Sequence, residues 1–129
     1  MARVLGVGGV FFKSRDPEKL KAWYVENLGI ELDDEGYIIF KWSELGRIRL
    51  RAYTLWGLFP EDTKYFEPSK ASAMVNLVVD DLDEMLESLR SKGVQIDDHI
   101  EEYQEGRFGW FIDPEGNKIE LWEPPREER

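Results

Sequence analysis

Apolar residues recur along the chain at helical spacing in two places. In residues 81–93 they fall at i, i+3, i+4 and i+7, the spacing of a helix that buries one face. Asp81 is suited to cap the start of this helix, with Glu84 three residues later in a capping box, and Gly93 is suited to end it. In residues 16–29, Leu20, Trp23, Tyr24 and Leu28 also fall at helical spacing between Asp16 and Gly29, so the sequence predicts two helices of nearly the same length.

Segments rich in β-branched and aromatic residues surround both helices and predict strands. The expected strands are residues 4–14, 30–33, 37–42 and 47–54 around the first helix, and residues 73–79, 94–97, 100–104, 107–112 and 117–123 around the second. The last two are joined by Asp113-Pro114-Glu115-Gly116, a type I turn followed by a glycine suited to positive φ. This repeated order of strand, helix and further strands predicts an α+β fold, because a helix bundle or a parallel doubly wound sheet needs a different order.

Length and composition predict a single domain, residues 1–129. A chain of this length with 42% hydrophobic residues can bury a core without disulfides, and it contains no cysteine. The sequence GLFPEDTKYFEPSK interrupts the repeat, but its aromatic residues make it too apolar for a solvated linker, so we expect it to pack onto the domain. The domain then divides into module one at about 4–56, a connecting loop at 57–70 and module two at about 72–123.

The charge and the missing motifs exclude several classes of function. The net charge is −10, which argues against binding nucleic acid or an anionic membrane, because both need a cationic surface. No run of about 18 apolar residues is present, and the N-terminal segment lacks the long apolar region of a signal peptide, so we expect a cytoplasmic protein. The lack of cysteine also excludes thiolate catalysis.

Three stretches, DPEKLKAWYVENLGIEL, VVDDLDEMLESLRSKGVQI and GRFGWFIDPEGNKIELWEPP, together resemble the vicinal oxygen chelate superfamily. That superfamily includes glyoxalase I, bleomycin-resistance proteins and extradiol dioxygenases. The resemblance covers about residues 6–124. It implies two βαβββ modules that form a curled mixed sheet with a concave cleft, helices on the convex side, and a homodimer.

The resemblance also shows where the family's enzymes would hold a divalent metal, through four side chains on four strands. At the first and third positions this chain has Gly9 and Met74, and residues 47–56 offer no His, Asp, Glu or Cys for the second. Only the fourth position carries a ligand, Glu120. One carboxylate cannot hold Zn²⁺ or Mg²⁺, and the single histidine, His99, is expected on the surface. The sequence therefore predicts no metal and no cofactor.

Strand alternation predicts which residues face the cleft. Ile119 and Leu121 should meet the helices, whereas Lys118, Glu120 and Trp122 should face the cleft. The other residues that we expect to line the cleft or its rim are Arg49, Arg51, Trp56, Phe59, Phe66, Asn76, Tyr103, Arg107 and Trp110.

Plainer interpretations of these residues stay open. Arg49 and Arg51 would otherwise be exposed, pair with the acidic surface, or pair with Glu120 in a polar floor that holds no ligand. The aromatic residues would otherwise build core. In the functional interpretation, one of these arginines offers a bidentate clamp to a carboxylate or phosphate, and the aromatic residues of the connecting loop cover the cleft.

The leading expectation is a metal-independent small-molecule-binding protein of the glyoxalase and bleomycin-resistance type. It would sequester or sense an amphipathic, aromatic-containing ligand, with Glu120 as hydrogen-bond acceptor or counter-charge. One alternative is a metal-free lyase or isomerase that uses Glu120 as general base, with an arginine stabilising the enolate. Another is an interaction module whose cleft is filled by its own side chains. The expected partners are an unidentified small molecule and a second copy of the chain.

Overall fold

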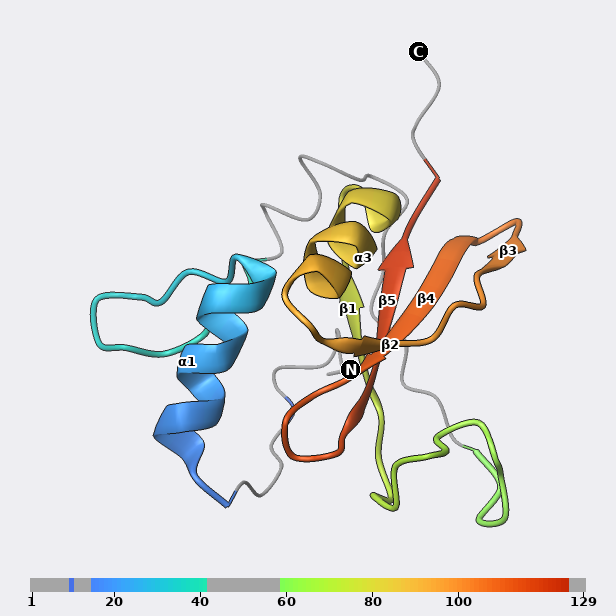
Figure 1. Cartoon of the computed structure of the whole chain (residues 1–129), viewed down its shortest axis with the longest axis horizontal. Helices are drawn as coiled ribbons and strands as arrows, with labels where there is room; N and C mark the ends of the chain where they lie inside the picture. Colours follow the sequence, from blue (N-terminus) through green and yellow to red (C-terminus); the bar gives the residue numbers. More distant parts are fainter. Residues whose placement is uncertain (1–9, 11–14, 42–58, 126–129) are drawn as a thin grey trace, which may run out of the picture.

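Five strands form one mixed sheet that packs against two helices in the computed structural model (Figure 1). The structure describes residue 10, residues 15–41 and residues 59–125. The elements are α1 (Pro17–Leu28), β1 (Val75–Val78), α3 (Leu82–Ser91), β2 (Gln95–Ile96), β3 (Glu101–Tyr103), β4 (Gly106–Ile112) and β5 (Lys118–Glu123). The strand order is β1-β5-β4-β2, and β3 pairs with β4 as well. β1 runs parallel to β5, and the other pairs are antiparallel.

Both helices begin and end as their sequences predict. The Asp16 side chain accepts a hydrogen bond from the backbone N–H of Lys19 at 3.2 Å, and Asp81 accepts one from that of Glu84 at 3.0 Å. These bonds satisfy N–H groups that have no partner within the helix. Gly29 ends α1 in the left-handed conformation, with φ of 66°, which glycine adopts without steric cost.

The hydrophobic core lies between the helices and one face of the sheet. Its buried members are Leu20, Tyr24, Val79, Leu82, Leu86, Leu89, Phe111, Ile119 and Leu121. Gly109 permits the close approach of α3, because a Cβ atom added there would lie 3.1 Å from Cδ1 of Leu86. The core therefore uses every second residue of β4 and β5 and leaves the alternate residues for the opposite face.

The turn between β4 and β5 ties this hairpin to α1. The Asp113 side chain is 4% exposed and accepts a hydrogen bond from the Tyr24 hydroxyl at 2.8 Å. Glu115, in the same turn, accepts a hydrogen bond from the backbone N–H of Arg15 at 2.8 Å, just before the start of α1. These contacts join residues that are 89 and 100 positions apart in the sequence and fix the position of the hairpin.

Module two follows the predicted order, and the α+β fold class is confirmed. Its helix and five strands all form, with bounds within about two residues of the expected ones. Within residues 30–41 the only pairing is an isolated bridge between Leu32 and Ile38, where two strands were expected. The strand expected at 47–54 and all but one residue of the strand expected at 4–14 lie outside the described residues.

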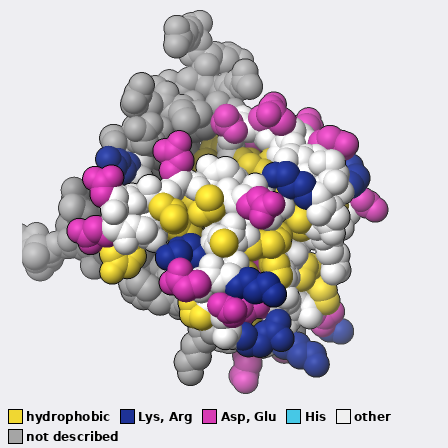
Figure 2. Space-filling view, turned by 60° about the vertical axis from the view of Figure 1, so that its left-hand side comes forward, with side chains coloured by type: hydrophobic (Ala, Val, Ile, Leu, Met, Phe, Trp, Pro, Cys, Tyr) yellow, Lys and Arg dark blue, Asp and Glu magenta, His cyan; other side chains and the backbone are white. Residues whose placement is uncertain are grey.

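The described surface carries both signs of charge. Figure 2 shows Asp and Glu side chains interspersed with Lys and Arg on one face of the molecule. In the described part of the chain, no helix is long and apolar enough to cross a membrane.

Candidate functional site

The face of the sheet opposite the helices carries a row of three polar residues from three strands. In the strand register, Glu120 of β5 lies between Asn76 of β1 and Trp110 of β4. Alternation places all three on the same face, because Ile119 and Leu121, on either side of Glu120, belong to the core. The pairing of the strands thus brings together residues that are up to 44 positions apart in the sequence.

Glu120 is a buried carboxylate, 9% exposed, and three neutral groups donate hydrogen bonds to it. The Asn76 side-chain amide donates to Oε1 at 2.7 Å. The Trp110 indole N–H donates to Oε2 at 2.9 Å, and the Tyr65 hydroxyl donates to the same oxygen. Hydrogen bonds to an ionised acceptor are stronger than those between neutral groups, so these three donors offset much of the cost of burying the carboxylate.

Tyr65 reaches Glu120 from the connecting loop, outside the sheet. Its ring stacks on Phe59 at 5.5 Å between centroids and meets Trp110 edge-on at 5.9 Å, and Phe66 packs against Phe59 at 5.1 Å. Burial of the phenol raises the pKa of Tyr65, and the hydrogen bond to the Glu120 carboxylate raises it further. Tyr65 therefore keeps its proton and stays a hydrogen-bond donor to Glu120.

A cation and an imidazole complete the surroundings of Trp110. The Lys118 ammonium lies 5.1 Å from the centroid of the Tyr65 ring and 5.5 Å from that of Trp110, and it donates a hydrogen bond to the Tyr65 carbonyl. A cation at this distance from an aromatic face is attracted by the ring quadrupole. The His99 ring lies parallel to Trp110, with 6.2 Å between centroids, and its Nε2 is 3.7 Å from Glu101.

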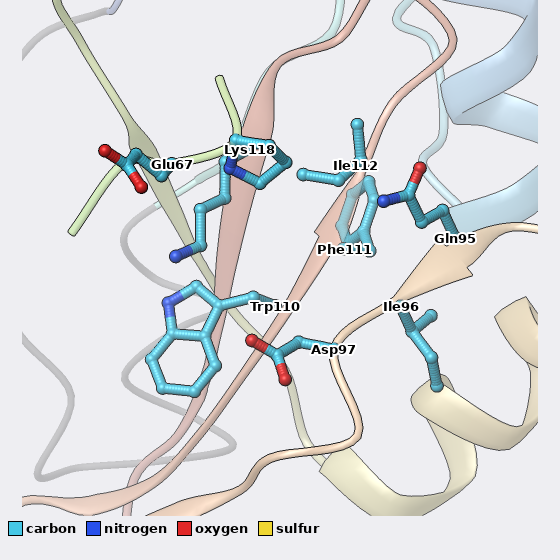
Figure 3. Close-up of a pocket in the computed structure, with 9 residues that line it drawn as sticks. Glu67, Gln95, Ile96, Asp97, Trp110, Phe111, Ile112 and Lys118 are labelled. Carbon is cyan, nitrogen blue, oxygen red and sulfur yellow. The ribbon is translucent and has the colours of Figure 1, made fainter. Parts of the chain in front are cut away.

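A pocket of about 130 Å³ opens beside this cluster. It is lined by Glu67, Pro68, Gln95, Ile96, Asp97, Trp110, Phe111, Ile112 and Lys118. Figure 3 shows the Lys118 ammonium beside the indole of Trp110, with the Asp97 carboxylate on the other side of that ring. The pocket thus combines apolar and aromatic walls with a few charged groups, a composition that is typical of small-molecule sites.

The structure brings some of the expected site residues together. Glu120, Asn76 and Trp110 form the hydrogen-bonded row, and Phe59 and Phe66 lie in the aromatic cluster around Tyr65. Arg49, Arg51 and Trp56 lie outside the described residues.

Three other expected residues make contacts outside the hydrogen-bonded row. Arg107 faces α3 and forms a bidentate pair with Asp83, with N–O distances of 2.9 and 3.0 Å, so it is not on the rim of the site. Trp122 shares the face of Glu120, but its indole donates to the carbonyl of Glu105 at 2.8 Å. Tyr103 is 57% exposed, and its ring packs on Phe108.

Lys118 and Tyr65, which contact Trp110 and Glu120, were not among the expected ligand-binding residues. Alternation placed Lys118 on the correct face, but nothing in the sequence indicated that its ammonium would lie against two aromatic rings. Tyr65 belongs to a loop whose apolar character predicted packing, and no periodicity exists there to show which side chain points inward. The only sequence signal for Tyr65 was its place among the loop's aromatic residues.

The described residues do not fit the divalent metal of the family's enzymes. No group of three His, Cys, Asp or Glu side chains that could hold a metal occurs among them. Both oxygens of Glu120 face hydrogen-bond donors, and the indole N–H of Trp110 cannot act as a metal ligand. The Lys118 ammonium lies over the ring of Trp110, which donates to Glu120, so this neighbourhood already holds a cation.

Comparisons with known proteins agree with this fold. The family described as Glyoxalase/Bleomycin resistance protein/Dioxygenase superfamily matches residues 10–121. YaeR of Escherichia coli (strain K12), an uncharacterized protein, is 31% identical over 108 residues, which are 80% of this chain and 84% of YaeR. TnmS3, an antibiotic binding protein from Streptomyces sp. CB03234, has a similar structure, with a TM-score of 0.53 and 30% identity over 85% of this chain and 88% of TnmS3.

A superfamily member from Sphaerobacter thermophilus DSM 20745 is also similar, with a TM-score of 0.50 and 26% identity over 84% of this chain and 88% of that one. The family match spans most of the chain, and these structures share its fold. The chain therefore belongs to the glyoxalase, bleomycin resistance protein and dioxygenase superfamily, which supports a small-molecule-binding role at the level of the family.

Proposed function

We propose that this protein binds an amphipathic, aromatic-containing small molecule without a metal, and sequesters or senses that molecule. The ligand occupies the face of the sheet opposite the helices, with Glu120 as its polar anchor. One observation carries the proposal: a carboxylate that is only 9% exposed faces away from the hydrophobic core and lies among aromatic rings. A buried acceptor in an aromatic setting is suited to orient a ligand that has both an apolar body and a donor group.

The antibiotic-binding neighbour supports this proposal. TnmS3 shares the fold and 30% of aligned residues with this chain, and binding an antibiotic is a function without a chemical step. We infer a function of the same kind for this chain, in which the small molecule is held and released unchanged.

The hydrogen bonds of Glu120 support binding over proton abstraction. A general base needs a free lone pair within reach of the substrate proton. Here Oε2 accepts from two donors and Oε1 from a third, so about one of the four acceptor positions of the carboxylate is left, and three fixed donors hold the group as a hydrogen-bond acceptor. Arg107, the arginine expected at the rim, is engaged with Asp83 on the helix side.

A second candidate function is favoured by Tyr65. Because the chain's own phenol covers Glu120, the protein also fits an interaction module whose cleft is filled by its own side chains. The two candidates differ in one measurable property: a binding protein is stabilised by small aromatic compounds, and a filled module is not.

We further propose that the protein is a homodimer, as the family resemblance implies. Analytical ultracentrifugation at micromolar concentration tests this directly, with a mass of twice 15.2 kDa expected. A sedimenting species of 15.2 kDa at all concentrations would contradict it.

The central experiment is a thermal-shift screen of amphipathic aromatic compounds on protein that has been treated with a chelator. A compound at about 100 times its Kd adds roughly 2.7 kcal/mol of stability, which is a clear rise in Tm. Glu120→Gln is expected to weaken the binding of each hit at least about tenfold, because a neutral amide replaces a charged acceptor. The matched control is Glu26→Gln, an exposed carboxylate of α1, which should leave affinity unchanged.

Three results would contradict the proposal. Hits that bind only when a divalent ion is restored would show a metal-dependent site. Equal affinity in wild type and Glu120→Gln would remove Glu120 from the site. A screen without any hit would favour the filled interaction module.

A further inference from the structure

The environment of Tyr65 resembles a binding site with its ligand in place. The residue comes from the connecting loop, yet its hydroxyl donates to Glu120, the polar anchor of the opposite face. Its ring is held on one side by Phe59, stacked at 5.5 Å with an angle of 18°, and meets the edge-on ring of Trp110 at 5.9 Å and 85°. Offset-stacked and edge-on arrangements are the favourable ones for aromatic pairs.

The charge around this ring also selects for an aromatic group. Lys118 places its ammonium 5.1 Å from the centroid of the Tyr65 ring. An aliphatic chain in the same place would lose the cation–π attraction and would leave the ammonium against apolar surface. The cation and the carboxylate therefore recognise different parts of one group: the ring and its hydroxyl.

Space for a larger molecule lies next to this position. The pocket of about 130 Å³ shares Trp110 and Lys118 with the surroundings of the Tyr65 ring, and its wall includes Glu67 and Pro68, which follow Tyr65 closely in the chain (Figure 3). A molecule that placed its phenol where the Tyr65 phenol now lies would therefore have this pocket next to it, across Trp110 and Lys118.

We propose that Tyr65 is an internal stand-in for the ligand, and that the ligand is a phenol-bearing aromatic compound. Its hydroxyl replaces the Tyr65 hydroxyl on Oε2 of Glu120, and its remaining ring system extends into the adjoining pocket. This inference rests on the proposed function and deepens it, since it names the chemical class of the ligand and the residue that competes with it.

The test uses a pair of probes that differ only in the donor, 2-naphthol and 2-methoxynaphthalene. Calorimetric titration measures the Kd of each for the wild type, Tyr65→Ala and Tyr37→Ala. Tyr65→Ala should bind 2-naphthol at least about tenfold tighter than the wild type, because the internal competitor is gone. It should also prefer 2-naphthol to the ether by about tenfold or more, because only the phenol donates to the carboxylate. Tyr37 is 62% exposed, and its removal should change neither Kd.

A second measurement keeps the inference testable if Tyr65→Ala fails to fold. This measurement follows the indole N–H resonance of Trp110 by NMR in the wild type, and the resonance is assigned by its loss in Trp110→Phe. The resonance should shift on addition of 2-naphthol and not on addition of the ether, because this N–H shares Oε2 of Glu120 with the phenol. Similar affinities of the two probes, or an unchanged indole signal with 2-naphthol, would overturn the phenol inference. If binding of the hits from the library screen still depended on Glu120, the proposed function would stand even though the phenol inference had failed. If no aromatic compound bound any variant, both would fail.

Discussion

On the helix side of the sheet, Phe111, Ile119 and Leu121 are almost completely closed to solvent and belong to the hydrophobic core, whereas on the other side the same two strands present Trp110 and Glu120. The first face is satisfied by packing alone, because dispersion and the release of water need no particular partner. The second face carries a polar group, whose burial is tolerated only while every donor and acceptor finds its counterpart.

This difference separates stability from recognition. A close-packed apolar face offers a ligand no hydrogen-bonding group that could change its partner. On the polar face, one of the three donors to Glu120 comes from a loop, so another donor can take its place without disturbing the sheet. The four predictions below test whether the two faces are as independent as this comparison implies.

The largest effect is expected from Leu121→Ala, on the helix side. Leu121 is fully buried in the core, so its truncation should lower the free energy of unfolding by about 3 kcal/mol, through lost burial and the cavity left behind. Urea denaturation measures this loss. Ligand selectivity between 2-naphthol and its ether should not change, and a changed selectivity would show that the two faces are coupled.

Tyr24→Phe should cost about 2 kcal/mol, because it removes a hydrogen bond to the buried Asp113 carboxylate. Burial raises the pKa of Tyr24 above its ordinary value of 10.0, and the charge of Asp113 raises it further. Above about pH 10 the folded state therefore keeps a proton that the unfolded state releases. The free energy of unfolding is unaffected by this tyrosine below about pH 10 and falls as the pH rises above it.

The slope of this alkaline loss gives a second readout. Each tyrosine with a raised pKa contributes at most about 1.4 kcal/mol per pH unit to this slope. Tyr24→Phe should remove the contribution of one such tyrosine. Urea denaturation between pH 9 and pH 11 is the measurement, with the exposed Tyr37→Phe as control. An unchanged slope in Tyr24→Phe would contradict the assignment.

Trp110→Phe should cost about 1.5 kcal/mol, since it removes one donor from Glu120 but keeps an aromatic ring. The matched variant is Trp122→Phe, on the same face, which loses an equivalent bond to the Glu105 carbonyl. Both variants should be destabilised to a similar extent, and only Trp110→Phe should alter the affinity for 2-naphthol. Equal effects on binding would indicate that the whole face, rather than the row at Glu120, recognises the ligand.

The smallest effect is expected from Asp83→Asn. Its pair with Arg107 lies on the helix side with the carboxylate largely exposed, and exposed ion pairs contribute about 0.5 kcal/mol or less. The loss should shrink further at high salt, and ligand affinity should stay constant. A clear drop in the ligand affinity of Asp83→Asn would show that Arg107 contributes to ligand binding.

The sequence by itself determined most of module two. The helix at Leu82–Ser91 follows from its apolar spacing and its Asp81 cap, and the strand alternation around Glu120 placed this carboxylate on the correct face. These features depend on residues close together in the chain, whose periodicity directly reflects helix and strand geometry. Asn76 was also expected to face the cleft by alternation, whereas Trp110 was expected there only as one of the aromatic residues of module two.

Only the tertiary structure determined the hydrogen-bond and ion-pair partners of the site residues. Arg107 was expected at the rim and instead pairs with Asp83 of α3, because its position in β4 turns it toward the helices. Tyr65 covers Glu120 from 55 residues away, in a loop with no repeating pattern that could reveal which side chain points inward. Local sequence sets the direction of a side chain in a regular element. Which groups meet depends on how distant segments pack, and this packing determines which donors reach the buried Glu120 carboxylate.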